Sequence, residues 1–222
     1  PGVFTAMSAA SATTAFKLAD ASSYDAFAGD FEQLTERFSR PIAADLIAFA
    51  DLGAAARVLD VGCGTGILTR LAGDLAPRAQ IVGVDLSEGM LAQAVRLAAD
   101  AGLGERVRFQ TADAEQLPFA DHGFDRVISL FALRHFPDPA AALRQMFRVL
   151  EPGGRCAVGV GAGPPVFSLE SYAVLEEGVA RAAACGFTDV VVHWPRAEGV
   201  YAGDEATLEE VAARLPELHA VR

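Results

Sequence analysis

One stretch decides the fold expected for this chain, and it reads Arg57-Val58-Leu59-Asp60-Val61-Gly62-Cys63-Gly64-Thr65-Gly66. It begins as a short apolar run and ends in three glycines on alternate positions, and residues 67–72 that follow have helical spacing. This pattern predicts a strand, a tight loop and a helix. Glycines let such a loop adopt open dihedral angles and let a ligand approach main-chain N–H groups at the start of the helix. The stretch therefore indicates a nucleotide-like ligand.

The spacing of the glycines separates the known classes of nucleotide loop. A dinucleotide loop has its last glycine one residue later, where this chain carries Ile67. A phosphate-binding P-loop requires a Lys followed by Ser or Thr, and this loop has no such pair. A nicotinamide or flavin cofactor is thus a disfavoured alternative, and a P-loop nucleotide is not expected.

Composition narrows the class of protein. The chain has 222 residues, of which 52% are hydrophobic, and no uninterrupted apolar stretch approaches the length of a membrane span. Its net charge of −11 argues against nucleic acid or an anionic membrane as partner, because both require a basic surface. Three scattered cysteines without a Cys-x-x-Cys motif predict neither disulfides nor a metal site, and favour a cytoplasmic location. The sequence carries no signal for oligomeric state.

The beginning of the chain divides into two parts. Residues 1–22 are rich in Ala, Ser and Thr, with Lys17 as the first charge, and show no sustained period. We interpret them as a flexible or added N-terminal segment. Residues 23–222 are expected to form a single domain. Its first part, 23–52, carries amphipathic patterns and Pro41 at a helix start, which predicts an N-terminal helical cap.

Strand and helix patterns alternate through the rest of the chain. Strands are expected at 57–61, 80–85, 106–110, 124–130, 155–161, 186–194 and 199–202. Helices are expected at 67–72, 87–97, 138–150, 171–184 and 205–215. Alternation at this pace predicts an α/β protein with a mostly parallel, doubly wound sheet of seven strands.

Candidate site residues follow the ends of consecutive strands. Asp60 lies at the end of the first strand, Asp85 at the end of the second, and Asp113 shortly after the third. A single Asp in such a position is more often a cap or turn residue. In an open α/β sheet, however, ligands bind beyond the carboxyl ends of the strands where the strand order reverses. The joint arrangement therefore predicts one binding crevice.

The same segments resemble the motifs of the class I S-adenosylmethionine-dependent methyltransferases. Residues 60–66 are similar to the first motif of that family, 82–91 to the second, 111–119 to the third and 124–127 to the fourth. Residues 133–154 resemble the ubiquinone/menaquinone C-methyltransferase branch in particular. The resemblance implies a Rossmann-like fold, S-adenosylmethionine as cofactor, and a small apolar or aromatic molecule as methyl acceptor, modified at carbon or oxygen.

Carried over by position, the resemblance also implies the part of the site that holds the methionine end of the cofactor. Gly62, Cys63, Gly64 and Gly66 would surround this end, and Asp60 would lie near its amino group.

The nucleoside end of the cofactor is assigned by the same resemblance. Asp85 would hold the ribose hydroxyls, with Leu86 beside the adenine and Met90 packed on the ring. Asp113 would accept a hydrogen bond from the adenine amino group, and Ala114 would supply a backbone contact.

Further residues are expected around this cofactor. Tyr24 and Phe27 match the N-terminal aromatic residues that close over it in the family, although packing against the core explains them equally well. Leu130 ends the fourth strand at the same crevice. His135, which stands where the quinone branch has Asn, is the candidate general base, with orientation of its own turn as the alternative.

Two alternatives to methyl transfer stay open. The segment between the fifth strand and residue 186 is shorter than in the quinone branch, so a binding module that has kept the fold and lost catalysis is a second hypothesis. A nicotinamide oxidoreductase is a third, disfavoured by the position of Gly66.

Arg134 could meet an acidic substrate, but an ion pair with Asp138 four positions later is the preferred expectation.

Overall fold

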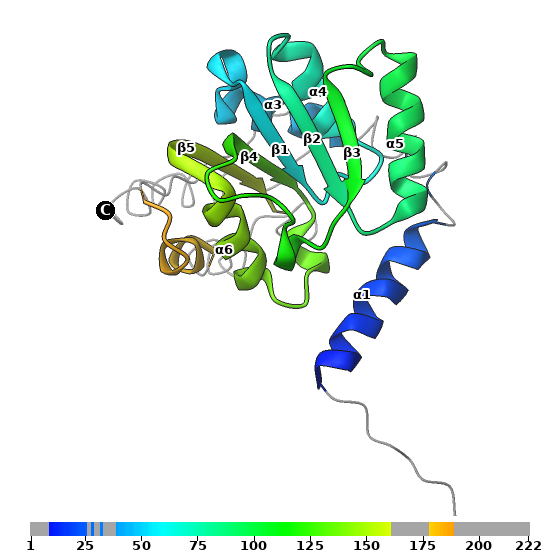
Figure 1. The fold of residues 1–222 in the computed structure, drawn as a ribbon, viewed down its shortest axis with the longest axis vertical. Helices are drawn as coiled ribbons and strands as arrows, with labels where there is room; N and C mark the ends of the chain where they lie inside the picture. The colour runs from blue at the N-terminus through cyan, green and yellow to red at the C-terminus, as the bar shows by residue number, and fades with distance from the viewer. Residues whose placement is uncertain (1–8, 26–27, 29–31, 33–38, 161–177, 189–222) are drawn as a thin grey trace, which may run out of the picture.

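The computed structural model describes residues 9–25, 28, 32, 39–160 and 178–188 (Figure 1). The helices of this part are α1 (Ala9–Asp25), α3 (Arg40–Ala50), α4 (Ile67–Leu75), α5 (Glu88–Asp100) and α6 (Pro139–Val149). Short 3-10 turns are η2 (Leu52–Ala54), η3 (Ala114–Gln116) and η4 (Leu133–His135). The strands are β1 (Arg57–Val61), β2 (Gln80–Asp85), β3 (Val107–Thr111), β4 (Phe124–Leu130) and β5 (Leu150–Gly159).

The described strands form one sheet of five strands in the order β3-β2-β1-β4-β5. Every neighbouring pair is parallel. The chain moves outward from β1 to β3, then returns to the other side of β1 with β4. The order therefore reverses between β1 and β4, which makes the carboxyl ends of these two strands the expected binding crevice.

Helices cover both faces of the sheet (Figure 1). Val58 of β1 packs with residues of α3 and α4, whereas the next residue, Leu59, packs with residues of α6 on the opposite face. Both side chains are fully buried. Because successive residues of a strand point to opposite faces, a strand covered on both sides reads as a continuous apolar run. This explains the composition of the stretch before the glycines.

The helices that follow β2 and β4 begin at side-chain caps. The Ser87 hydroxyl accepts a hydrogen bond from the Met90 N–H at 3.1 Å and starts α5. Asp138 accepts a hydrogen bond from the Ala141 N–H at 2.9 Å and starts α6, which has Pro139 in its first turn. Such caps satisfy N–H groups that have no partner within the helix.

The structure confirms the predicted α/β class and the predicted parallel strands at the centre of the sheet. β1, β2 and β4 have the expected bounds, and the other described strands and helices of the sheet lie within a few residues of theirs, except β5, which begins at Leu150 instead of 155. Residues 152–154, which separate the expected helix and strand, lie within β5, and a register shift between the pairs at Phe124 and Arg126 accommodates them.

Helix α1 lies largely within the segment interpreted as flexible or added. Residues 1–22 show no sustained period, yet α1 runs from Ala9 to Asp25. The segment is rich in Ala, the best helix former, but lacks the apolar stripe by which amphipathic helices are recognised. Polar contacts to the sheet edge hold it, as described below. The division into a segment 1–22 and a domain 23–222 stays a prediction in other respects.

Several predictions fall on residues outside the described part. These are Phe27, most of the strand at 186–194, the strand at 199–202 and the helix at 205–215. Of the helix predicted at 171–184, residues 178–184 are described and helical. The sixth and seventh strands of the sheet thus stay predictions. Among the described residues, no helix has the length and apolar character needed to cross a membrane.

Candidate functional site

A cavity of about 430 Å³ opens at the carboxyl edge of the sheet, at the reversal of strand order. The loop after β1, the ends of β2 and β4, the segment after β3 and the inner face of α1 form its walls. The predicted site residues that line it are Tyr24, Asp60, Gly62, Cys63, Gly64, Asp85, Leu86, Met90, Asp113, Ala114, Leu130 and His135. Gly66 is not among the lining residues and instead caps α4.

The glycine loop combines close packing with an open surface. Gly62, Gly64 and Gly66 have φ of +72°, +54° and +80°, the left-handed region that glycine enters without strain. A Cβ on Gly62 would lie 2.3 Å from the Cβ of Ala132, whereas a Cβ on Gly64 would meet no described atom within 4 Å. Since Gly64 also lines the cavity, a side chain there would project into the binding space.

Asp60 brings a buried carboxylate to the floor of the cavity. Its side chain is 1% exposed, and its Oδ2 accepts a hydrogen bond from the Thr69 hydroxyl at 2.5 Å. Its Oδ1 has no partner among the described residues, and neither has the buried hydroxyl of Thr65. Burial raises the pKa of Asp60 to about 7, an effect that the hydrogen bond from Thr69 offsets in part. Both orphaned atoms are available to a polar ligand group.

Asp85 is held by the backbone of two neighbouring segments. Its Oδ2 accepts a hydrogen bond from the Gly64 N–H at 2.8 Å and its Oδ1 one from the Ser87 N–H at 3.0 Å. Burial raises the pKa of Asp85, and these backbone N–H groups oppose the rise. A carboxylate has about four acceptor sites, so Asp85 keeps room for a further donor. The carboxylate therefore presents two fixed acceptor positions to the cavity.

Asp113 lies in a cluster of charges that includes a residue of α1. The Lys17 Nζ donates hydrogen bonds to Asp113 Oδ2 and Glu115 Oε2, both at 2.7 Å. Asp113 Oδ1 also accepts from the Glu115 N–H at 2.9 Å, which caps η3. All three residues of this cluster line the cavity.

His135 contacts two further residues of α1. Its Nδ1 lies 3.4 Å from Asp20 Oδ2, and its Nε2 lies 3.4 Å from the Tyr24 hydroxyl. The rings of Tyr24 and His135 meet edge to face, with centroids 5.3 Å apart. Burial raises the pKa of Tyr24. All three residues line the cavity, so the arrangement offers a proton acceptor, a hydroxyl and a carboxylate in a row.

The expected ion pair between Arg134 and Asp138 is wrong. Asp138 caps α6 and pairs instead with Arg144, at 3.5 Å. One oxygen of Asp138 is thus used by the helix cap and the other by the pair with Arg144. Arg134 lines the cavity.

Sequence reasoning missed the contribution of α1. Lys17, Asp20 and Ala21 line the cavity together with Tyr24, and their spacing is that of one helical face. The helical spacing of these residues was the available signal. The face that they form has no apolar stripe, however, and the helix predictions depended on apolar stripes. Phe131 was also missed; it follows β4 with φ of +60°, an unusual value for a residue other than glycine.

The amino-acid sequence of this chain is similar to those of known methyltransferases. Residues 58–154 match the protein family described as "Methyltransferase domain". A demethylmenaquinone methyltransferase of Thermus thermophilus is 46% identical over 109 residues, which are 49% of each chain. A ubiquinone/menaquinone biosynthesis C-methyltransferase of Pseudomonas fluorescens is 40% identical over 135 residues, 60% of this chain and 50% of that one. The chain thus spans about half the length of the curated relatives it matches.

Solved structures share the fold over a larger part of the chain. The [4+2]-cyclase SpnF is 28% identical, with a TM-score of 0.59 over 79% of this chain and 67% of that one. A structure described as a putative S-adenosyl-L-methionine-dependent methyltransferase of Methanococcus maripaludis is 23% identical, with a TM-score of 0.54 over 82% of this chain and 77% of that one. The second likeness bears on the fold alone.

Proposed function

Because residues 58–154 match a methyltransferase domain, we propose that this chain is a class I S-adenosylmethionine-dependent methyltransferase, which transfers a methyl group from that cofactor to a small acceptor molecule at carbon or oxygen. The observation that carries the proposal is the convergence of Asp60, Asp85 and Asp113 on one cavity beside the glycine loop. The cofactor supplies a methyl group on a sulfonium, a leaving group that is already activated. The protein therefore has mainly to bind the cofactor and the methyl acceptor, to align them with each other, and to exclude water.

The residues of the cavity fit the cofactor. Its ammonium group requires a buried acceptor, and Asp60 Oδ1 is a buried oxygen without a partner in the described structure. Its ribose diol requires two acceptors, which the two oxygens of Asp85 offer. Its adenine amino group requires an acceptor at the end of the cavity, where Asp113 lies. Gly64 leaves the space beside the loop open.

The acceptor would occupy the part of the cavity beyond β4. Leu130 at the end of β4, and Phe131, Ala132 and Phe136 shortly after it, line the cavity together with Tyr24. Their apolar and aromatic side chains support an apolar or aromatic acceptor. The relatives named for demethylmenaquinone and ubiquinone/menaquinone biosynthesis support the same class. The identity of the acceptor is left to experiment.

His135 is the proposed proton acceptor. Neutral imidazole can take a proton from an acceptor hydroxyl near neutral pH, and a hydrogen-bonded partner on the other ring nitrogen orients the ring. Asp20 is near Nδ1, which leaves Nε2 on the side of the Tyr24 hydroxyl. The hydroxyl of the methyl acceptor would give its proton to Nε2 of His135, either directly or by way of the Tyr24 hydroxyl.

Calorimetry with S-adenosylhomocysteine and with NAD tests the cofactor. We expect S-adenosylhomocysteine to bind and NAD to give no heat; binding of NAD alone would overturn the proposal. Purified protein should then be incubated with cofactor labelled in its methyl group and with candidate quinols and phenols. Mass spectrometry would identify the labelled product.

A second candidate function is binding or rearrangement of a ligand without methyl transfer. It is favoured by the likeness to the solved structure named as a [4+2]-cyclase. Under this alternative S-adenosylhomocysteine would bind, yet no tested acceptor would gain the label. A cytoplasmic location and the absence of nucleic acid partners belong to the proposal for either function.

A further inference from the structure

We propose that Lys17 belongs to the cofactor site, where it positions Asp113 so that the site selects adenine by its amino group. The inference rests on the proposed binding of S-adenosylmethionine. It extends that function to helix α1, a part of the chain outside the residues that match the family.

The contacts of Lys17 are those of a built ionic cluster. Its Nζ lies 2.7 Å from Asp113 Oδ2 and 2.7 Å from Glu115 Oε2. The side chain of Lys17 is 11% exposed, that of Glu115 11% and that of Asp113 26%. Charge-assisted hydrogen bonds of this length in a half-buried place are stronger than surface pairs. Lys17 is also the single lysine of the chain.

The cluster fixes the direction in which Asp113 points. Asp113 Oδ1 accepts from the Glu115 N–H at 2.9 Å, and Glu115 Oε1 accepts from the Asp138 N–H at 2.9 Å. Both carboxylates are thus held at both oxygens. The cluster joins α1, η3 and the start of α6 around the end of the cavity.

Charge explains why this arrangement requires Lys17. Two carboxylates two residues apart at the cavity repel each other, and the ammonium between them attracts both and so offsets their mutual repulsion, leaving a net charge of −1. Without it, the Asp113 side chain would gain by turning toward water. A carboxylate accepts hydrogen bonds and donates none, and each oxygen has a lone pair beyond its present bond. A held Asp113 therefore suits an amino group and opposes a carbonyl oxygen.

The adenine base carries an amino group at its position 6, and hypoxanthine carries a carbonyl oxygen there. The natural probe pair is S-adenosylhomocysteine and S-inosylhomocysteine, which differ at that position alone. The inference predicts that the ratio of their dissociation constants depends on Lys17. A role of Lys17 in docking α1 alone would change both affinities together and leave the ratio as it is.

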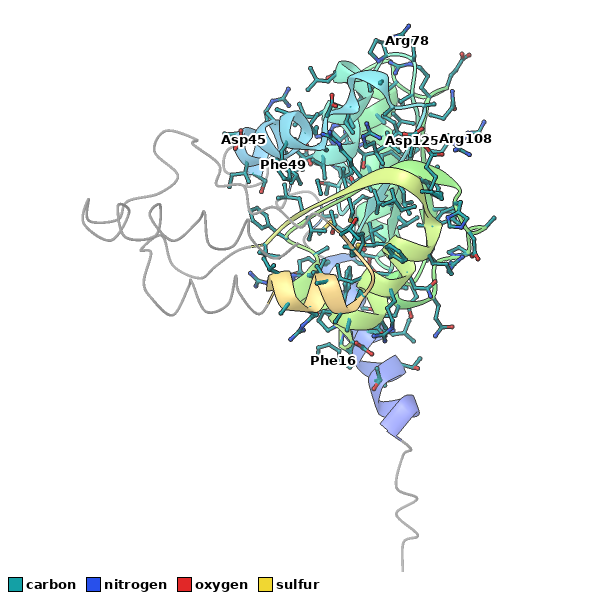
Figure 2. The ribbon with its side chains drawn as sticks, turned by 90° about the vertical axis from the view of Figure 1, so that its left-hand side faces the viewer. Phe16, Asp45, Phe49, Arg78, Arg108 and Asp125 are labelled. Carbon is teal, nitrogen blue, oxygen red and sulfur yellow. The ribbon has the colours of Figure 1, made fainter. Side chains whose placement is uncertain are left out.

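Titration calorimetry of both probes with wild type, K17M, K17R and R78M provides the test. Arg78 is exposed in the loop between α4 and β2 and lies far from Phe16 of α1 (Figure 2), so R78M is a control for the loss of one positive charge. Circular dichroism checks that each variant folds. We expect K17M to bind S-adenosylhomocysteine about tenfold more weakly and to lose most of the preference for it. K17R and R78M should keep the preference.

Three results would be decisive against the inference. Unchanged affinity and preference in K17M would remove Lys17 from the site. Tighter binding in K17M would mean that Lys17 competes with the base. Equal weakening for both probes would assign Lys17 to helix docking. Failure of wild type to bind either probe would instead overturn the proposed function.

A second measurement reports on Lys17 directly. Biosynthetic labelling with ¹³C,¹⁵N-lysine marks Lys17, the single lysine of the sequence, and keeps all three of its N–H donors. We expect S-adenosylhomocysteine to shift the NMR signal of the labelled Lys17 side chain. A Lys17 signal that ignores saturating ligand would contradict the inference.

Discussion

The Thr69 hydroxyl, in the first turn of α4, donates a hydrogen bond to Oδ2 of Asp60, and Oδ1 of the same carboxylate is buried without a described partner. The pair joins the end of β1 to the helix beyond the glycine loop. One oxygen of Asp60 thus stabilises the loop, and the other is left for a ligand. The free protein has no counter-charge for Asp60 within the described hydrogen bonds, and two predictions follow from its titration.

The first prediction concerns stability. Burial raises the pKa of Asp60 from 3.8 to about 7, so the folded state holds its proton more tightly than the unfolded state. The stabilisation is fully present below pH 4 and is lost as the pH rises toward 7. Relative to D60N, the wild type should lose on the order of 4 kcal/mol over this range. Urea unfolding of both proteins at several pH values measures the difference, and parallel curves would contradict it.

The second prediction concerns the ligand. If the ammonium group of S-adenosylhomocysteine pairs with Asp60, binding favours the charged carboxylate and releases a proton below pH 7. Affinity should therefore rise about tenfold between pH 5.5 and 7. Calorimetry in two buffers with different ionisation enthalpies counts the protons. D60N is the control, which should release none; an equal release from D60N would show that another group titrates.

The third prediction tests the packing of the glycine loop. Gly66 and Gly102 have φ of +80° and +71°, so alanine strains the backbone at both. A Cβ on Gly66 would lie 2.9 Å from the Phe109 ring, whereas a Cβ on Gly102 would meet no described atom within 4 Å. G66A should therefore be about 1–3 kcal/mol less stable than G102A by urea unfolding. The F109L change should recover part of the loss in G66A; equal stability of G66A and G102A would exclude the steric contact.

The fourth prediction separates fold from site. Asp125 Oδ2 accepts hydrogen bonds from the Ala56 and Arg57 N–H groups, both at 3.0 Å, and so holds the start of β1 beside β4. D125A leaves both donors unpaired and should lower the free energy of unfolding by about 2–3 kcal/mol. The exposed Asp74 offers the matched control D74A, with little expected change. Because Asp125 does not line the cavity, affinity for S-adenosylhomocysteine should be the same in both variants.

The fifth prediction addresses His135. With an acceptor identified by labelled methyl transfer, H135A should lower kcat about 100-fold or more, because it removes the proton acceptor. D20N should lower kcat less and shift the pH profile, since Asp20 acts through the ring of His135. H122A is the control, because His122 bonds to the Leu150 carbonyl, away from the cavity. Wild-type turnover in H135A would end its candidacy as a base.

Local sequence patterns predicted most of the helices and strands and most of the residues at the strand ends. The apolar run before Gly62, the caps Ser87 and Asp138 and the acids after the strands are all readable within short windows. Parallel strands then bring their carboxyl ends to one edge, so the cavity residues of the sheet followed from topology. The expected pair of Arg134 with Asp138 failed because two local uses competed for one carboxylate, and the helix cap prevailed.

The sequence by itself determined the sheet, its order of elements and the residues at the ends of the strands, because hydrophobic period and turn residues encode them locally. Only the tertiary structure decided that α1 forms a wall of the cavity. Lys17 meets Asp113 across 96 residues of sequence, and Tyr24 meets His135 across 111. No period marks such a contact, since a polar residue finds its partner only after the apolar elements have packed. The glycine loop thus indicated the resemblance to methyltransferases, and a distant helix adds a wall to the cavity.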